Sequence, residues 1–342
     1  MYKIIRSKSP LRIGLAGGGT DVSPYSDIYG GAILNVTINL YAYTSIEPTM
    51  DGKITLISAD RNEMASFSSA EKLPIDGKLD LAKGIYNRIV KDYVKKPLSF
   101  TLTTYVDAPA GSGLGTSSSL VVSILSAFAD WLNIPLGEYE LAQLAYEIER
   151  NDLKMAGGKQ DQYAAAFGGV NFMEFFGEGK VIVNPLRIKT EYLAELNNNI
   201  ILYYTGTSRL SSKIIERQQD NVQDKNVKSL EAMHKLKEQA VMMKEAMLRG
   251  QMDKIGEILN FGWEYKKQMA KEISNEVIDN IYESALQSGA SGGKISGAGG
   301  GGFMFFYCPG TSRYNVIKRL SELGGEFRRY QFVTEGAISW KF

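Results

Sequence analysis

Hydrophobic and polar residues alternate in short runs through the first half of the chain. Ala32–Glu47 is rich in β-branched and aromatic residues, which predicts one long strand or a bent pair of strands. Lys53–Ala59 and Ser99–Val106 have a similar character and predict two further strands. Gly168–Glu174 and Lys180–Asn184 are expected to form a hairpin. Glycine and proline separate these runs, so this half should contain many short strands.

Two segments between these strands are predicted to be helices. Ser119–Leu132 is apolar nearly all round, which is typical of a buried helix. Gly137–Arg150 carries apolar residues at helical spacing. A buried strand begins near Asn198, and we expect the polar residues 218–226 beyond it to be the most flexible part. The remaining expected elements are helices at Lys228–Arg249, Met252–Ala270, Val277–Ser288 and around 314–323, a strand at 303–308 and a closing strand.

Length and composition indicate an ordinary globular protein of two domains. The chain has 342 residues, of which 44% are hydrophobic and 23% charged. The pattern restarts near Asn198, so we expect one domain at 1–190 and a second at 191–342. The net charge of +1 gives no reason to expect a nucleic-acid or membrane partner. No stretch has the length of a signal peptide or a membrane span, so we expect a cytoplasmic protein.

The chain has one cysteine, Cys308, and one histidine, His234. A disulfide framework is therefore excluded, and zinc sites built from Cys and His are nearly so. Catalysis of the Ser-His-Asp or Cys-His kind is equally disfavoured. Any chemistry must come from carboxylates, Lys or Arg, hydroxyl groups and the backbone. His234 lies in a predicted helix among several methionines, and we assign it no chemistry.

Three segments are unusually rich in glycine: LAGGGTD (15–21), PAGSGLGTSSS (109–119) and KISGAGGGGF (294–303). Glycine costs conformational entropy on folding, so such runs suggest that something must approach the backbone closely. In the second segment a strand enters and an apolar helix leaves. Bare N–H groups, hydroxyls and the positive end of the helix would together hold phosphate. The alternative is a tight turn with an N-cap serine.

Two common nucleotide motifs do not explain these segments. The sequence G-x-x-x-x-G-K-[ST] is absent, because Lys294 is followed by Ile295 and lacks the glycine spacing. Gly297, Gly299 and Gly302 match G-x-G-x-x-G, but they precede a strand instead of opening a helix. Glycines that allow tight packing remain an equal alternative for the third segment.

The three segments together resemble the motifs of the GHMP kinases, the family of galactokinase, homoserine kinase and mevalonate kinase. PAGSGLGTSSS is similar to the family's P-x-G-x-G-L-G-S-S-A, SPLRIGLAGGGTD (9–21) to its first motif and KISGAGGGGF to its third. They occur in family order over roughly residues 3–307. The resemblance implies an α+β fold of two domains. The N-terminal domain would be like ribosomal protein S5 domain 2, and the C-terminal domain would be ferredoxin-like.

The resemblance also implies ATP and Mg²⁺ as cofactors. Ser117 and Glu149 match the family's magnesium ligands, although Glu149 could instead be a solvated carboxylate on a helix that also carries Glu147. The second motif would bind the ATP phosphates through Pro109, Gly111, Ser112, Gly113, Leu114, Gly115, Thr116, Ser117 and Ser118.

Asp161, in GGKQDQYAAAFGG, matches the family's catalytic aspartate. The simpler alternative is an aspartate that caps the following helix. Arg12 occupies the basic position of the first motif, where it could pair with Asp161 and stabilise the transferring phosphoryl group. A surface arginine at the end of a strand is the alternative.

The first motif is also expected to bind the substrate, through Gly18, Gly19, Thr20 and Asp21, together with Gly299 of the third. Turn formation is the simpler role for Asp21. GGGTD lacks the Glu and His of the galactokinase motif, which argues against galactose. The segment more closely resembles the branch of D-glycero-D-manno-heptose 7-phosphate kinases, with fucokinase domains as near relatives.

That branch implies phosphorylation of the anomeric hydroxyl of the heptose 7-phosphate to a 1,7-bisphosphate, on the way to nucleotide-activated heptose. L-fucose 1-kinase, or another GHMP kinase of small molecules, is the alternative. A regulator without turnover would have lost the aspartate or the loop serines, and all are present. A sugar phosphate needs cations, for which Lys8, Lys159 and Arg209 are candidates, each with a solvated surface charge as the alternative. The oligomeric state stays open, a homodimer included.

Overall fold

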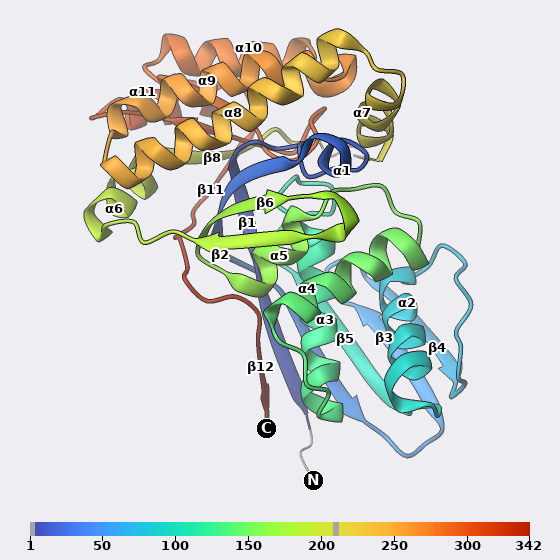
Figure 1. Cartoon of the computed structure of the whole chain (residues 1–342). Coiled ribbons are helices and arrows are strands. Elements are labelled where there is room, and N and C mark those ends of the chain that lie inside the picture. Colours follow the sequence, from blue (N-terminus) through green and yellow to red (C-terminus); the bar gives the residue numbers. More distant parts are fainter. Residues whose placement is uncertain (1–3, 208–211) are drawn as a thin grey trace.

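An eight-stranded sheet organises the first half of the chain (Figure 1). The computed structural model describes residues 4–207 and 212–342. The main path is β12-β1-β2-β5-β3-β4, while β6 pairs with β2 and β7 pairs with β6. All pairings are antiparallel except β3 with β5. The strands are β1 (Ile5–Ala16), β2 (Gly31–Pro48), β3 (Lys53–Ser58), β4 (Glu63–Ser68), β5 (Phe100–Val106), β6 (Val170–Phe175), β7 (Val181–Pro185) and β12 (Ile338–Lys341).

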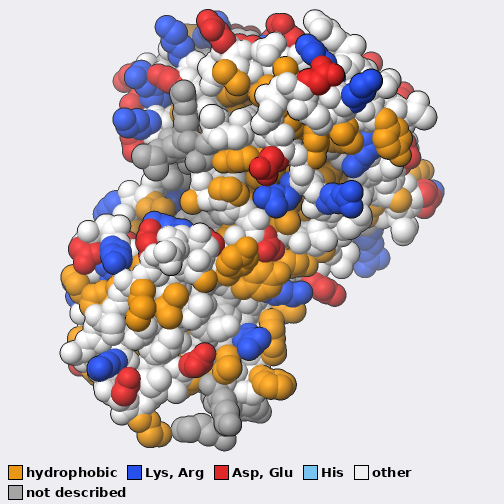
Figure 2. All heavy atoms as spheres, turned by 180° about the vertical axis from the view of Figure 1, so that it is seen from behind, with side chains coloured by type: hydrophobic (Ala, Val, Ile, Leu, Met, Phe, Trp, Pro, Cys, Tyr) orange, Lys and Arg blue, Asp and Glu red, His pale blue; other side chains and the backbone are white. Residues whose placement is uncertain are grey.

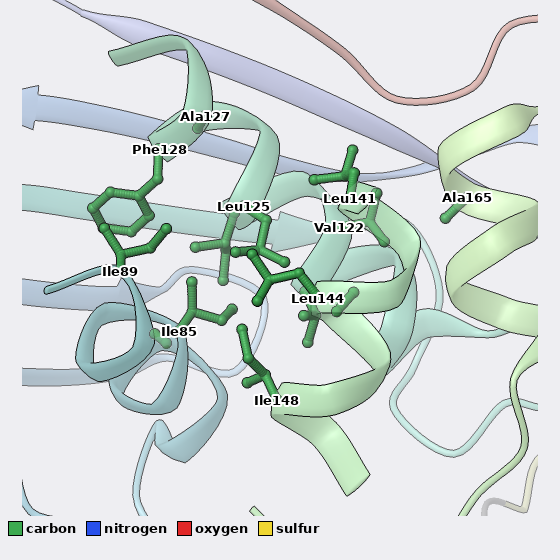
Figure 3. Close-up of a cluster of buried hydrophobic side chains, with 14 of the residues drawn as sticks. Ile85, Ile89, Val122, Leu125, Ala127, Phe128, Leu141, Leu144, Ile148 and Ala165 are labelled. Atoms are coloured by element: carbon green, nitrogen blue, oxygen red, sulfur yellow. The ribbon is translucent and has the colours of Figure 1, made fainter. Parts of the chain in front are cut away.

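Four helices pack together beside this sheet and form the first core. Figure 3 shows Val122, Leu125 and Phe128 of one helix packed with Ile85 and Leu144 of two others. The predicted buried helix is confirmed, and it begins three residues earlier because the hydroxyl residues of the glycine loop form its first turn. The helices are α2 (Asp80–Ile89), α3 (Thr116–Leu132), α4 (Glu138–Glu147) and α5 (Gln160–Phe167).

A four-stranded antiparallel sheet organises the second half, in the order β11-β8-β10-β9. Helices connect β8 to β9 and β10 to β11, which gives the βαββαβ arrangement of a ferredoxin-like domain, as expected. The strands are β8 (Ile200–Tyr204), β9 (Gly292–Ile295), β10 (Phe303–Tyr307) and β11 (Glu326–Arg328). The helices are α8 (Val227–Arg249), α9 (Ile255–Lys266), α10 (Glu276–Gln287) and α11 (Arg313–Ser321).

Several elements differ from the sequence prediction. The segment expected to be flexible overlaps a helix, α7 (Ser212–Gln223), which buries Ile214, Gln218 and Val222 on one face. These residues lie four apart, but the polar composition around them hid the spacing. The predicted helix at Met252–Ala270 is shorter, as the 3₁₀ turn η4 (Met252–Lys254) followed by α9. The sequence reasoning missed β4, β9, α2, α1 (Tyr25–Tyr29) and α6 (Thr190–Asn199), and it expected one closing strand where the chain forms β11 and β12.

The end of the chain returns to the first sheet. β12 pairs with β1 so that Lys341 lies opposite Ile5 and Ile338 opposite Lys8, and Figure 1 shows β12 beside the first part of β1. The predicted second domain at 191–342 therefore contributes one strand to the first sheet. The rear view shows two lobes with a waist between them (Figure 2). Among the helices that residues 4–207 and 212–342 form, none is both long and apolar enough to cross a membrane.

Candidate active site

The three glycine segments meet around one cavity. Residues of the first sheet, of the helices above it and of the second lobe all line it. The lining includes Gly18, Gly19 and Asp21 from the first segment, Gly111, Gly113 and Gly115–Ser118 from the second, Ser296–Gly299 and Gly301 from the third, and Arg12, Glu149 and Asp161.

The third segment packs directly on the second. Gly113 has φ +84°, and a Cβ there would lie 2.3 Å from the carbonyl oxygen of Ser296. The Ser296 hydroxyl donates a 2.8 Å hydrogen bond to the Gly113 carbonyl. The third segment therefore fits both expected roles. Its glycines allow tight packing against the second segment, and its residues line the cavity.

The start of α3 faces the cavity. Gly115, with φ +78°, is the N-cap of this 17-residue helix, and Thr116 and Ser117 of the first turn line the cavity. The free N–H groups and positive end of a long helix stabilise an anion placed there. This geometry suits a phosphate group.

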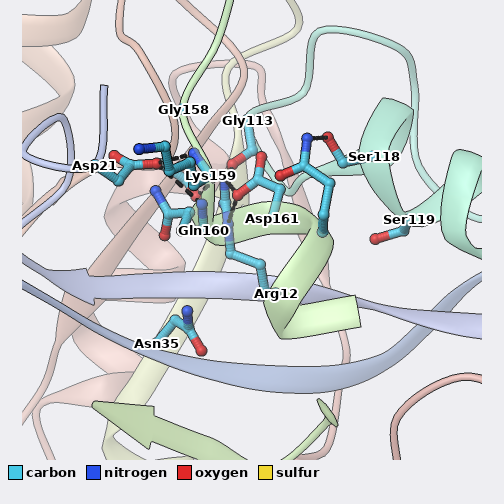
Figure 4. A network of polar contacts seen from close by, with 12 residues as sticks. Arg12, Asp21, Asn35, Gly113, Ser118, Ser119, Gly158, Lys159, Gln160 and Asp161 are labelled. Atoms are coloured by element: carbon cyan, nitrogen blue, oxygen red, sulfur yellow. Dashed lines mark hydrogen bonds and ion pairs between the residues drawn. The ribbon is translucent and has the colours of Figure 1, made fainter. Parts of the chain in front are cut away.

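Arg12 and Asp161 form a close ion pair at the centre of the site (Figure 4). Arg12 Nε and Nη2 each lie 2.7 Å from Oδ1 of Asp161, and Nη1 donates to the carbonyl of Gly113 at 2.6 Å. Arg12 is 3% exposed, so it is no surface arginine. Asp161 lies one residue inside α5 and makes no cap. The pair joins β1, α5 and the glycine loop.

Glu149 is buried, at 1% exposure, and not solvated. It lies in the π-helical turn η2 (Ile148–Asp152), which extends α4. Its Oε1 accepts a 3.2 Å hydrogen bond from the Ser117 hydroxyl, and its Oε2 accepts one from the Gln162 amide. Mg²⁺ is commonly held by one or two protein oxygens together with phosphate oxygens. A buried carboxylate beside a serine hydroxyl at the cavity wall fits that requirement.

Asp21 is far from α5 in the sequence, but its side chain holds the beginning of this helix. Its Oδ2 accepts hydrogen bonds from the backbone N–H groups of Lys159 (2.9 Å) and Gln160 (3.0 Å). Burial raises the pKa of Asp21 above its usual value. A Cβ at Gly158 would lie 1.9 Å from the same oxygen, so only glycine fits there. Asp21 therefore both positions the helix that carries Asp161 and faces the cavity.

Most of the other predicted residues lie around the loops and are not part of the cavity lining. The Thr20 hydroxyl donates to the carbonyls of Gly17 and Ala32 and so fixes the first glycine segment. Ser112 and Leu114 are buried behind the second segment, and Pro109 is exposed at its start. Gly299 lines the cavity.

Of the predicted phosphate-binding cations, the two that the structure describes, Lys8 and Lys159, do not line the cavity. Lys8 Nζ lies 4.5 Å from the ring centroid of Tyr41, and Lys159 Nζ pairs with Asp27 at 3.0 Å. Neither residue is part of the described cavity lining. Arg209 lies outside the described residues.

Sequence reasoning missed two buried lysines of the cavity wall, Lys266 and Lys294. Lys266 follows Gly262 and Trp263 on the buried face of α9, and a lysine on such a face is a recognisable signal. Lys294 opens the third glycine motif itself. Burial lowers the pKa of Lys266 to about 8, and burial, with Lys266 and Arg12 nearby, lowers the pKa of Lys294 well below its usual value.

Comparison with known proteins identifies relatives over the whole chain. Residues 80–169 match the model for the GHMP kinases N terminal domain, and residues 243–326 match that for the GHMP kinases C terminal domain. The chain is 52% identical over 339 residues to a D-glycero-alpha-D-manno-heptose 7-phosphate kinase of Campylobacter jejuni, covering 99% of each. It is 28% identical over 97% of its length to an L-fucokinase/L-fucose-1-P guanylyltransferase of Bacteroides fragilis and covers 37% of that protein.

Solved structures give the same result. A structure described as a D-glycero-D-manno-heptose 1-phosphate kinase from B. thetaiotaomicron superposes with a TM-score of 0.84 at 48% identity, covering 99% of both chains. A galactokinase from Lactococcus lactis superposes with a TM-score of 0.79 at 20% identity, covering 98% of this chain and 95% of that one, which shows a common fold.

Proposed function

Because the chain belongs to the GHMP kinase family, whose members use ATP to phosphorylate small molecules, we propose that its substrate is D-glycero-D-manno-heptose 7-phosphate. It would phosphorylate the anomeric hydroxyl and release the 1,7-bisphosphate. The observation that carries the proposal is the 52% identity over 99% of the chain to a kinase named for this sugar phosphate. One relative is described as a kinase of the 7-phosphate and another as a kinase of the 1-phosphate. We propose the 7-phosphate as substrate, with the anomeric hydroxyl as the acceptor.

The reaction is an in-line transfer. The anomeric oxygen forms a bond to the γ-phosphorus of ATP, the bond from that phosphorus to the β,γ-bridging oxygen breaks, and ADP leaves. Asp161 accepts the hydroxyl proton, either fully or as an orienting hydrogen-bond acceptor. Arg12 supports this role because its two nitrogen atoms hold Oδ1 of Asp161 at 2.7 Å, which leaves Oδ2 for the substrate.

The second glycine segment and the start of α3 would receive the ATP phosphates. Ser117 and Glu149 would hold Mg²⁺, which supplies charge neutralisation for the phosphate oxygens when it is bound. Gln162 keeps Glu149 in place, since its amide donates both to that carboxylate and to the Ser118 hydroxyl, the latter at 3.1 Å.

We place the reaction in the cytoplasm, where ATP is available and the buried free thiol of Cys308 stays reduced.

An assay of ADP release with ATP and Mg²⁺ over a panel of sugars tests the proposal. The panel contains the heptose 7-phosphate, sedoheptulose 7-phosphate, mannose 6-phosphate, mannose, fucose and galactose. We expect turnover of the heptose 7-phosphate alone. Turnover of fucose in its place would make the chain a fucose 1-kinase. Silence across the panel with ATP bound would contradict a catalytic role.

A further inference from the structure

Two lysine ammonium groups border one small volume of the cavity beside the first glycine segment. Lys266 comes from α9 and Lys294 from β9, and both are almost fully buried. A methyl group built on Gly18 would lie 3.7 Å from Nζ of Lys294 and 3.8 Å from Nζ of Lys266. No other atom of the described chain lies within 4 Å of that position except those of the neighbouring residues.

Positive charge exceeds negative charge around this volume. Arg12 and Asp161 neutralise each other, and Asp21 is the remaining carboxylate next to Lys266. Nζ of Lys266 donates to the carbonyl of Gly18 at 3.2 Å, whereas Nζ of Lys294 has no hydrogen bond or ion pair with residues 4–207 or 212–342. Burial disfavours the charged form of both amines and so lowers their pKa values, and an anion placed between them would stabilise the charged form. The arrangement therefore suits an anionic group.

We infer that Lys266 and Lys294 bind the phosphate group that the sugar substrate already carries, and so select a sugar phosphate over a free sugar. This inference rests on the proposed function. Both lysines lie against Gly18, and Lys266 lies near Asp21, while the candidate ATP loop leads into α3, where Ser117 contacts Glu149 of η2. A phosphate dianion between two ammonium groups forms charge-assisted hydrogen bonds with both.

The absence of a side chain at Gly18 leaves this volume open. Gly18 does not have a positive φ, unlike Gly17 and Gly19, so an alanine is conformationally acceptable there. Its methyl group would contact only the two ammonium groups. Gly18→Ala is thus expected to fold normally and to occupy part of the phosphate position.

The test compares heptose 7-phosphate with unphosphorylated heptose in wild type, Lys266→Met, Lys294→Met and Gly18→Ala. Loss of a charged hydrogen bond should lower kcat/KM for the phosphorylated sugar about 30-fold or more in each lysine variant. Discrimination between the two sugars should fall by a similar factor, and the KM for ATP should stay the same. Lys267→Met is the matched control, because this neighbouring lysine pairs with Glu264 at the surface.

Each outcome of this comparison either supports or contradicts the role of the two lysines. An equal loss for both sugars, or a raised KM for ATP, would assign the lysines to the nucleotide and overturn the inference alone. A wild-type enzyme that phosphorylates fucose and ignores heptose 7-phosphate would overturn the proposed function and the inference together. Thermal unfolding without ligands separates misfolding from loss of binding. Lys294→Met replaces a buried amine that has no partner among the described residues, so it should not lower the stability.

Discussion

At the residue scale, some buried charged groups of the site are held by partners within the protein, whereas others have no partner of opposite charge. Arg12 and Asp161 are held to each other, and Glu149 is held by Ser117 and Gln162. These groups can keep their geometry without ligands. The two lysines have no comparable carboxylate partner, so their free energy should depend strongly on the substrate. The same cavity thus contains a preorganised catalytic part and a part that substrate binding completes.

Replacing Asp161 with asparagine tests the catalytic part. Asp161→Asn keeps the size of the side chain but removes the proton acceptor and the charge that pairs with Arg12. We expect kcat to fall by about 10³, within the range for acid–base groups, with little change in the KM for ATP. Steady-state kinetics measure both values. Asp92→Asn, which only weakens a surface pair with Arg88, should change neither, and near-wild-type turnover of Asp161→Asn would reject the role.

The lowered pKa of Lys266 predicts a pH dependence of substrate binding. Lys266 is protonated below about pH 8 and loses its charge above it, with burial as the main cause. Asp21 opposes the shift, and Arg12 and Lys294 are the cations nearby. We therefore expect kcat/KM for heptose 7-phosphate to fall as the pH rises through about 8. In Lys266→Met this fall in kcat/KM should be absent.

The Lys266 ammonium group should also affect the unfolding free energy of the ligand-free protein. This free energy should rise with pH in the range where substrate binding weakens. Between the folded pKa of about 8 and the usual value of 10.5, the unfolded chain binds the proton that the folded chain has released. Stability of the ligand-free protein should therefore rise with pH in this window from Lys266 alone. Urea unfolding of wild type and Lys266→Met at pH 7.5 and 10 measures the difference, and an identical pH response would contradict the assignment.

The motif residues of the site were predicted from sequence, whereas the two lysines were missed although Lys266 lies on a buried helix face and Lys294 opens the third glycine motif. Arg12, Asp161, Ser117 and Glu149 stand inside recognisable motifs, and the structure brings all four to one cavity. The proposed cations Lys8 and Lys159 are near motifs in sequence, but their side chains are directed to Tyr41 and Asp27. Proximity in sequence does not determine where a long side chain points once strand and helix directions are fixed.

At the element scale, two glycine loops from different lobes support each other. The backbone of the second segment at Gly113 lies against Ser296 of the third, and Phe303 N donates to the carbonyl of Ser112 at 2.9 Å. Arg12 joins the same point through the Gly113 carbonyl. The proposed phosphate loop therefore keeps its shape through contacts with the second lobe as well as with α3.

Gly113→Ala should break this contact. Gly113 has φ +84°, so an alanine there strains the backbone. The added methyl group would also lie 2.3 Å from the Ser296 carbonyl oxygen, so the third segment must move away. We expect a loss of about 2–4 kcal/mol in unfolding free energy and weaker ATP binding. Gly77→Ala is the matched control: its φ is +93° but nothing lies within 4 Å, so about 1 kcal/mol and unchanged ATP affinity are expected. Calorimetric titration and thermal unfolding compare the two variants.

Strands and long helices were predicted well because their periodicity is local. β2, β5, α3 and α8 are found close to their expected ranges. α7 was misjudged, since its three buried residues are separated by charged and amide side chains. α2 was missed although it packs on the first core. Its helical pattern is only about three turns long, and tertiary packing is what stabilises a helix of that length.

At the scale of the whole molecule, the chain does not divide into two consecutive pieces. It builds the first sheet, crosses to the second lobe, and returns to add β12 at the outer edge of β1. No local pattern near residue 190 could reveal this return, because strand pairing between residues 5–8 and 338–341 is a long-range event. β1 consequently links the closing strand at one end to Arg12 near the other.

Ending the chain after Gly336 tests whether this closure serves stability or catalysis. Four residue pairs between β1 and β12 would be lost, whereas Arg12 keeps its pairing with Thr37 of β2 and its bond to Gly113. We expect the melting temperature to fall by about 5 °C. Turnover at 25 °C should stay within about twofold, since the cavity retains all its lining residues. Phe342→Ala, which removes only a side chain that is 83% exposed, should leave both values unchanged. A truncated enzyme that remains folded at 25 °C but turns over at least tenfold more slowly would show instead that β12 helps β1 to hold Arg12 against Asp161.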